Sequence, residues 1–191
     1  MRKLALLILK LLGWTLVGEP PKAPKYVLIF APHTSNWDFF LMMLVRSALN
    51  IKPNFIGKHT LFVWPPVSWF MRSIGGEPVD RTKASNIVEQ VVNNFKTRPD
   101  YKFALSPEGT RSKKDHWKSG FYRIAVNAGV PIQLIYLHRP TKECGFGPLF
   151  QPTGDIDKDF EYLRNFYQDK KGFRPELLSD IRVRDEDNIK A

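Results

Sequence analysis

Two kinds of hydrophobic pattern alternate along this chain. Short, continuous apolar runs, which predict buried strands, span residues 26–31, 54–58, 101–105 and 131–137. Helices or helical turns are predicted, from apolar spacing or length, over residues 37–49, 61–74, 84–95, 121–128 and 157–168. Alternating strands and helices predict an α/β fold. We therefore expect a single domain with a mostly parallel central sheet flanked by helices.

The N-terminal segment is the most apolar part of the chain. Residues 4–17 predict a helix, but it is shorter than the roughly 20 apolar residues that cross a bilayer, and Lys10 interrupts it. A signal peptide is disfavoured because no small-residue cleavage site follows. The lysines of this N-terminal segment share one helical stripe, which suits a helix in the headgroup layer of a membrane. The alternative is a helix that packs on the protein's own core. We divide the chain into an N-terminal interfacial helix with linker (1–25), a main domain (26–179) and a charged tail (180–191).

Composition narrows the possible partners. The chain has 191 residues, and 29 Lys and Arg against 19 Asp and Glu give a formal charge of +10. Such a charge favours nucleic acid, acidic lipid or phosphorylated substrates. Nucleic-acid binding is disfavoured because the densest aromatic stretch, residues 61–70, contains no Lys or Arg. The single cysteine, Cys144, excludes an intrachain disulfide, and the four histidines lack metal-ligand spacing, so we expect no metal site.

A candidate catalytic pair follows the first predicted strand. His33 lies in the loop after this strand, and Asp38 lies at the start of the next predicted helix. If the chain folds back there, the helix N-terminus favours the carboxylate, which can orient the imidazole and stabilise it once it takes a proton. The alternative is an incidental histidine beside a helix cap formed by Ser35 or Asn36.

Cationic residues follow the later strands. Lys58 ends the second predicted strand, and Arg81 follows a short extended segment. Residues 106–112 follow the third strand; Gly109 permits close backbone approach with a free amide, and Arg111 offers a bidentate anion contact. Ligands of α/β sheets bind beyond the carboxyl ends of strands, so these loops are expected to meet. Each cation taken alone is also compatible with a solvated surface charge.

In their order and spacing, these loops resemble the sequence blocks of the glycerolipid acyltransferases, the lysophosphatidic acid acyltransferase family. The matching residues are His33-x4-Asp38, Gly57-Lys58-His59-Thr60-Leu61, Val79-Asp80-Arg81, Pro107-Glu108-Gly109-Thr110-Arg111-Ser112 and Val130-Pro131-Ile132. The resemblance covers residues 26–137, and the Pro-Glu-Gly-Thr-Arg-Ser block is its most specific part. Pro32 stands where many family members carry Asn, a departure that bears on the acceptor more than on the chemistry.

The resemblance implies that residues 26–179 form an acyltransferase domain. This domain would move a fatty acyl group from an acyl-CoA or acyl carrier protein thioester to a lysophospholipid, with 1-acylglycerol-3-phosphate as the expected acceptor. His33 is then the general base, oriented by Asp38, and no acyl-enzyme, metal or cofactor is implied. Lys58 and the Gly109 amide are placed near the developing oxyanion. The residues implied around the acceptor phosphate are Arg81, Glu108, Thr110 and Arg111.

Two other functions stay open: a non-catalytic lipid- or phosphate-binding domain on the same fold, and an acyltransferase with a non-glycerolipid acceptor. A binding domain would have no need of both His33 and Asp38. The aromatic segment 61–71 could line an acyl-chain groove, dip into a membrane or pack in the core. The basic N-terminus favours a peripheral protein at the cytoplasmic face of a membrane, with the anionic membrane surface as a partner and no nucleic acid.

Overall fold

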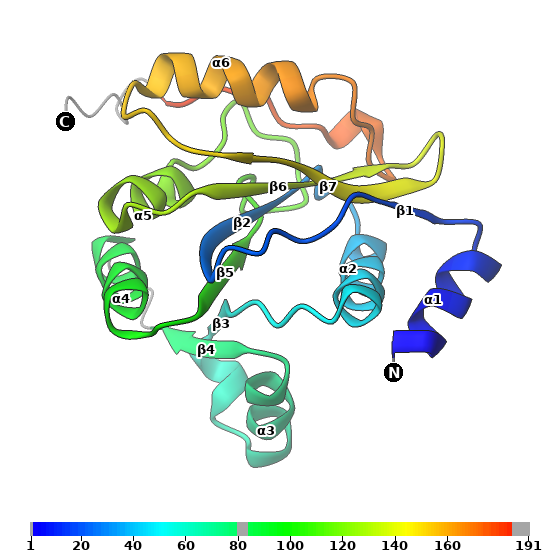
Figure 1. Cartoon of the computed structure of the whole chain (residues 1–191), viewed down its shortest axis with the longest axis horizontal. Coiled ribbons are helices and arrows are strands. Elements are labelled where there is room, and N and C mark those ends of the chain that lie inside the picture. Colours follow the sequence, from blue (N-terminus) through cyan, green and yellow to red (C-terminus); the bar gives the residue numbers. More distant parts are fainter. Residues whose placement is uncertain (1, 80–83, 185–191) are drawn as a thin grey trace.

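The computed structural model describes residues 2–79 and 84–184, and its centre is a five-stranded sheet (Figure 1). The strand order is β1-β7-β6-β2-β5. The strands are β1 (Thr15–Val17), β2 (Lys25–Ala31), β5 (Tyr101–Leu105), β6 (Ile132–His138) and β7 (Glu143–Phe150). Neighbouring strands are parallel except for β6 and β7, which are antiparallel. The predicted α/β domain with a mostly parallel sheet is confirmed.

Helices cover both faces of the sheet. On one face lie α1 (Arg2–Leu11) and α2 (Asn36–Leu49). On the other lie α4 (Ala84–Thr97), α5 (Gly120–Ala128) and α6 (Ile156–Tyr167). Within β2, Val27 belongs to the core beneath α4–α6 and Leu28 to the core beneath α1 and α2, as the two-residue period of a strand requires. The continuous apolar run of β2 therefore reflects burial on both sides.

A second, two-stranded parallel sheet extends from the main one. It pairs β3 (Phe55–Lys58) with β4 (Gly76–Val79), and the chain between them forms η1 (His59–Phe62) and α3 (Pro65–Ser73). The Phe62 ring packs against Gly57 and Gly76. A Cβ on Gly57 would lie 2.7 Å from this ring, and a Cβ on Gly76 would lie 3.2 Å from it. The Glu77 carboxylate accepts hydrogen bonds from Asn94 in α4, Arg98 just after α4 and Tyr101 in β5, and from Asn54 just before β3.

Several elements differ from the sequence-based expectation. Residues 15–17 are the edge strand β1, because α1 ends before Gly13, whose φ is +74°, and the chain then pairs with β7. The strand β4 occupies the short extended segment expected before Arg81, whereas β7 and the short helix η2 (Pro175–Leu177) were not predicted. The start of the predicted tail is packed, since Ile181 and Val183 lie against the core.

The N-terminal helix packs on the protein and also exposes an apolar face. Ala5 and Leu9 are buried in the α2 core, and Arg2 Nε donates to the Ala48 carbonyl at 3.2 Å. The exposed leucines are Leu4, Leu6, Leu7 and Leu11 within the helix and Leu12 directly after it. Packing of this helix on the core is thus confirmed for one face only. Among the described residues, no helix is both long and apolar enough to span a membrane.

Candidate active site

The loop after β2 brings His33 and Asp38 together. Ser35 caps α2, and the Asp38 side chain completes a capping box by turning back toward the loop. Asp38 Oδ2 accepts the backbone N–H groups of Thr34 and Ser35, both at 2.7 Å. His33 Nδ1 lies 3.3 Å from the same oxygen. The predicted cap and the predicted pair are therefore parts of one structure, and they are not alternatives.

The surroundings of Asp38 favour its role as an orienting carboxylate. Its side chain is fully buried at the N-terminus of α2, whereas the His33 side chain is 23% exposed. The contact between Nδ1 and Oδ2 is within ion-pair range but lacks hydrogen-bond geometry, as is common in catalytic sites without substrate. With Nδ1 turned toward Asp38, Nε2 is the ring nitrogen left for a substrate.

Glu108 connects the loop after β5 to the loop after β2. Its Oε2 accepts the backbone N–H of His33 at 2.9 Å, and its side chain is almost entirely buried. Burial raises the pKa of Glu108 to about 7, an effect partly offset by the hydrogen bond from His33. The carboxyl group thus holds the loop of His33 through the backbone of this residue, a role that the sequence did not indicate.

Arg111 forms a second connection between the same loops. Its guanidinium donates to the side-chain oxygen of Asn36 at the start of α2. Arg111 is otherwise exposed, so N–H groups of its guanidinium remain accessible to solvent. Thr110 lies beside it and accepts the Ser112 N–H through Oγ1 at 3.3 Å. The structure therefore joins Arg111 to the start of α2, the helix that carries Asp38, whereas the role of Thr110 stays a prediction.

The turn at Gly109 differs from the expectation in one respect. Gly109 has a φ of +64°, as its left-handed turn requires, but its amide donates to the Ser106 carbonyl at 3.2 Å. The expectation of a free amide is wrong for this structure. A side chain on Gly109 would meet Lys118, whose Nζ lies 2.8 Å from the ideal Cβ position. Lys118 is thus a further cation at this loop, which sequence reasoning did not single out.

The remaining predicted cations belong to the second sheet. Lys58 is the last residue of β3 and is paired in register with Val79, the last residue of β4. Parallel pairing puts these two strand ends at one edge of the second sheet, which is not the sheet whose loops carry His33 and Glu108, so the expected meeting of these loops stays a prediction. Arg81 lies outside the described residues.

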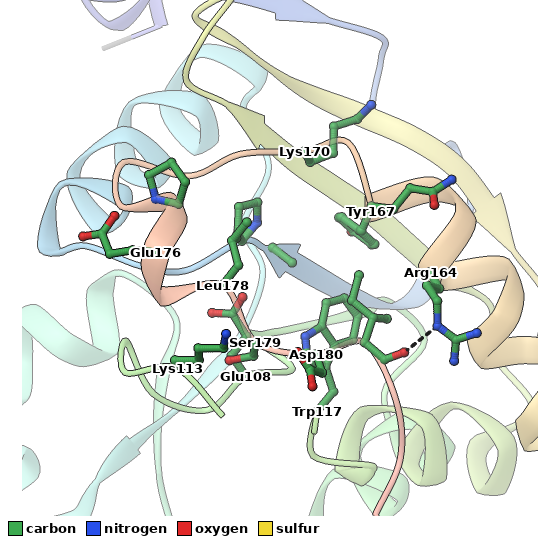
Figure 2. A pocket seen from close by; sticks show the side chains of 15 residues that line it. Glu108, Lys113, Trp117, Arg164, Tyr167, Lys170, Glu176, Leu178, Ser179 and Asp180 are labelled. Carbon is green, nitrogen blue, oxygen red and sulfur yellow. Dashed lines mark hydrogen bonds between the residues drawn. The ribbon is translucent and has the colours of Figure 1, made fainter. Parts of the chain in front are cut away.

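A cavity of about 400 Å³ lies on the α6 side of Glu108 (Figure 2). Pro32, Glu108 and Trp117 form part of its wall, together with the C-terminal segment 175–181. Arg164 on α6 fixes that segment by donating through Nε to the Ile181 carbonyl at 3.1 Å. Within residues 2–79 and 84–184, no three His, Cys, Asp or Glu side chains are grouped as metal ligands.

Comparison with known proteins identifies the family. The model of the family described as "Acyltransferase" matches residues 17–137, well over half of the chain. This chain belongs to that acyltransferase family. Its region of similarity contains the His–Asp pair and the Glu108 loop described above.

Two curated relatives share the central part of the chain. The 1-acyl-sn-glycerol-3-phosphate acyltransferase of Escherichia coli is 32% identical over 124 residues, which cover 60% of this chain and 48% of the relative. A chloroplastic 1-acyl-sn-glycerol-3-phosphate acyltransferase, BAT2 of Brassica napus, is 30% identical over 109 residues, covering 55% of this chain and 32% of the relative. The similarity spans about half of the bacterial relative and about a third of the plant one.

A solved structure shares the fold. The crystal structure of the 1-acyl-sn-glycerophosphate acyltransferase PlsC from Thermotoga maritima matches with a TM-score of 0.59 and 20% identity. The match covers 87% of this chain and 73% of that one. This similarity extends beyond the region matched by sequence and supports the fold assignment.

Proposed function

We propose that this chain transfers a fatty acyl group from an acyl-CoA or acyl carrier protein thioester to the hydroxyl of a lysophospholipid, with 1-acylglycerol-3-phosphate as acceptor. The observation that carries the proposal is the 3.3 Å pairing of His33 with buried Asp38 in a loop tied to Glu108 and Arg111. A hydroxyl that attacks a thioester needs a base, and an acceptor that bears phosphate needs a cation. The names of both curated relatives favour this acceptor.

In the proposed reaction, His33 acts as the general base through Nε2. The acceptor oxygen attacks the thioester carbonyl carbon while Nε2 takes the hydroxyl proton. A C–O bond forms, and the tetrahedral oxyanion then collapses with cleavage of the C–S bond. The departing sulfur takes the proton from the imidazolium, so His33 returns to its neutral form. Asp38 stabilises the imidazolium, and general-base assistance of this kind contributes about 10²–10⁴-fold in rate.

Cations would stabilise the negative charges of this reaction. We assign Lys58 to the oxyanion, and Arg81, Thr110 and Arg111 to the acceptor phosphate. The Gly109 amide could serve the oxyanion only by leaving the Ser106 carbonyl.

Glu108 has a different task in this proposal. It is an anion or a neutral acid in a buried position, and an anion would repel phosphate. Its bond to the His33 backbone makes it a positioning residue for the catalytic loop.

In this proposal, the protein works at the cytoplasmic face of a membrane, to which it binds peripherally. The outward leucines of α1, such as Leu7 and Leu11, offer an apolar surface of the kind that an interfacial helix inserts. The charge of +10 attracts the protein to anionic lipid. The lysophospholipid would then reach the site from the membrane surface.

A donor and acceptor panel tests the proposal. Purified protein is given radiolabelled acyl-CoA or acyl carrier protein thioester, with 1-acylglycerol-3-phosphate, other lysophospholipids or no acceptor. We expect phosphatidic acid as the main product and little release of free acid. Product with a different acceptor would retain the chemistry and change the acceptor. Folded protein that binds these lipids without product formation would favour the non-catalytic binding domain.

A further inference from the structure

The helix α3 turns its apolar side away from the protein. Ser68 is buried, with 8% exposed, whereas Trp69 and Phe70 are 73% and 57% exposed. Just before the helix, Val63 and Trp64 are 65% and 64% exposed. A helix that packs on its own core buries its apolar residues and exposes its polar ones. In α3, Val67 and Met71 are half-buried as this rule requires, but the two aromatic residues are exposed and so offer a surface to a partner outside the chain.

The inner side of α3 is already filled. Phe62 packs against the two glycines of the small sheet, and the Arg72 guanidinium lies 5.5 Å from the centre of the Phe62 ring. Arg72 Nε also donates to Ser68 Oγ at 3.4 Å. The bond to Ser68 lies within α3, whereas the Phe62 contact and the close approach of the Met71 carbonyl to Gly76 hold the helix against the small sheet. The exposure of Trp69 and Phe70 is therefore set by packing.

The charges around α3 favour an anionic lipid surface over other occupants. Between Lys58 and Glu77 the sequence has no Asp or Glu, while His59 and Arg72 are exposed. Tryptophan prefers the membrane interface, where its ring is buried and its N–H stays hydrated. The exposed leucine face of α1 is a second apolar surface on the same chain. In Figure 1, α3 projects from the body at the end opposite α6.

We propose that Val63, Trp64, Trp69 and Phe70 form an aromatic anchor that inserts into the headgroup region of an anionic bilayer. The choice of lipid as occupant rests on the proposed function. Since β3 ends at Lys58 immediately before η1, the anchor fixes this end of the small sheet near the membrane. The strand end that carries Lys58, the predicted oxyanion-binding cation, would thereby be held where the headgroup of a lysophospholipid lies.

Vesicle binding tests the anchor without any need for catalysis. Wild type is compared with the double variant Trp69→Ser/Phe70→Ser by co-sedimentation with phosphatidylglycerol–phosphatidylcholine vesicles. The matched control, Val126→Ser/Leu149→Ser, replaces two exposed apolar residues on other elements. We expect the anchor variant to bind at least about tenfold more weakly and the control to bind like wild type. Equal binding by anchor variant and wild type would overturn the proposal.

A second readout places Trp69 directly. The variant Trp69→Phe keeps an aromatic ring and removes one fluorophore. Brominated lipid quenches the emission of tryptophans that lie in the bilayer. The emission that wild type has and Trp69→Phe lacks should therefore be quenched by vesicles of brominated lipid. If that emission is unquenched, the anchor does not insert. If the wild type is a dimer without lipid and the anchor variant is a monomer, the occupant is a second copy of the chain and the lipid proposal is wrong.

The two proposals fail separately. Vesicle binding lost in the anchor variant, with no acyl transfer in any assay, would retain the anchor and reject the enzyme. Acyl transfer by wild type, together with vesicle binding that is unchanged in the anchor variant, would retain the enzyme and reject the anchor.

Discussion

The buried carboxyl of Glu108 accepts the backbone N–H of His33 at 2.9 Å, and this bond joins two loops that are 75 residues apart in sequence. The same loops are joined again by Arg111 and Asn36. The position of the proposed base therefore depends on a residue that does not touch its ring. Substitutions at Glu108 should separate positioning from charge.

Glu108→Gln is expected to change how stability depends on pH. Burial raises the pKa of Glu108 to about 7, so the folded state favours the neutral acid more than the unfolded state does. This contribution is fully present below the ordinary carboxyl pKa and is lost as pH rises through the folded value. Wild type should therefore lose about 2–3 kcal/mol relative to the glutamine variant between about pH 4.5 and pH 7. Thermal unfolding at several pH values measures the difference, and parallel profiles would contradict it.

Glu108→Ala supplies the comparison for positioning. The glutamine oxygen can still accept the His33 N–H, but alanine leaves it unpaired, at a cost of about 1–3 kcal/mol. We expect the alanine variant to lose both stability and turnover. Glutamine should retain the geometry, so similar kcat values for the two variants would argue against a positioning role.

Asp38→Asn should reduce turnover with little loss of folding. The amide oxygen can accept the N–H groups of Thr34 and Ser35, but it lacks the charge that stabilises an imidazolium. We expect kcat to fall about 10²–10⁴-fold. Asp38→Ala should in addition lose about 1–2 kcal/mol of stability through the helix cap. Full activity of the asparagine variant would remove Asp38 from the mechanism.

Arg111→Lys should weaken recognition of phosphate. Lysine keeps the charge but loses the planar, bidentate contact, so we expect KM for a phosphate-bearing acceptor to rise about tenfold. A monoacylglycerol acceptor without phosphate should show no such change. Lys96→Gln, an exposed change at the end of α4, is the control. Equal effects on both acceptors would show that Arg111 acts on the fold and not on the phosphate.

Cys144 should be unreactive toward thiol reagents and dispensable for turnover. It is 1% exposed on β7, and burial raises the pKa of its thiol to about 12, so the reactive thiolate is rare. We expect Ellman's reagent to leave the native protein unmodified, and Cys144→Ala to retain kcat. A radiolabelled acyl group attached to Cys144 after incubation with donor would instead indicate an acyl-enzyme.

The sequence predicted the fold where hydrophobic periodicity was strong. The buried run of β2 and the apolar spacing of α4 were placed correctly because each is fixed by local pattern. The strand β1 was missed, since three residues at a sheet edge carry almost no periodic signal and their pairing with β7 is a long-range contact. The β7 strand, with five exposed or half-buried positions and two glycines, resembled a loop for the same reason.

The candidate site was predictable in its residue types but not in its connections. The spacing of His33 and Asp38 was sufficient to propose their contact, because a helix cap lets the chain fold back. The role of Glu108 depends on burial and on a backbone partner far away in sequence, and Lys118 reaches Gly109 only through a tertiary contact. Neither relationship leaves a pattern in the sequence.

The role of His33 as general base is tested by comparing acyl transfer by His33→Ala with that by His116→Gln, which changes a histidine outside the proposed machinery. Both proteins are first shown to have the wild-type fold by circular dichroism, and donor and 1-acylglycerol-3-phosphate are then supplied at saturation. We expect His33→Ala to lose about 10²–10⁴-fold in kcat and His116→Gln to retain it. Equal turnover by the two variants would contradict the assignment of His33 as the base.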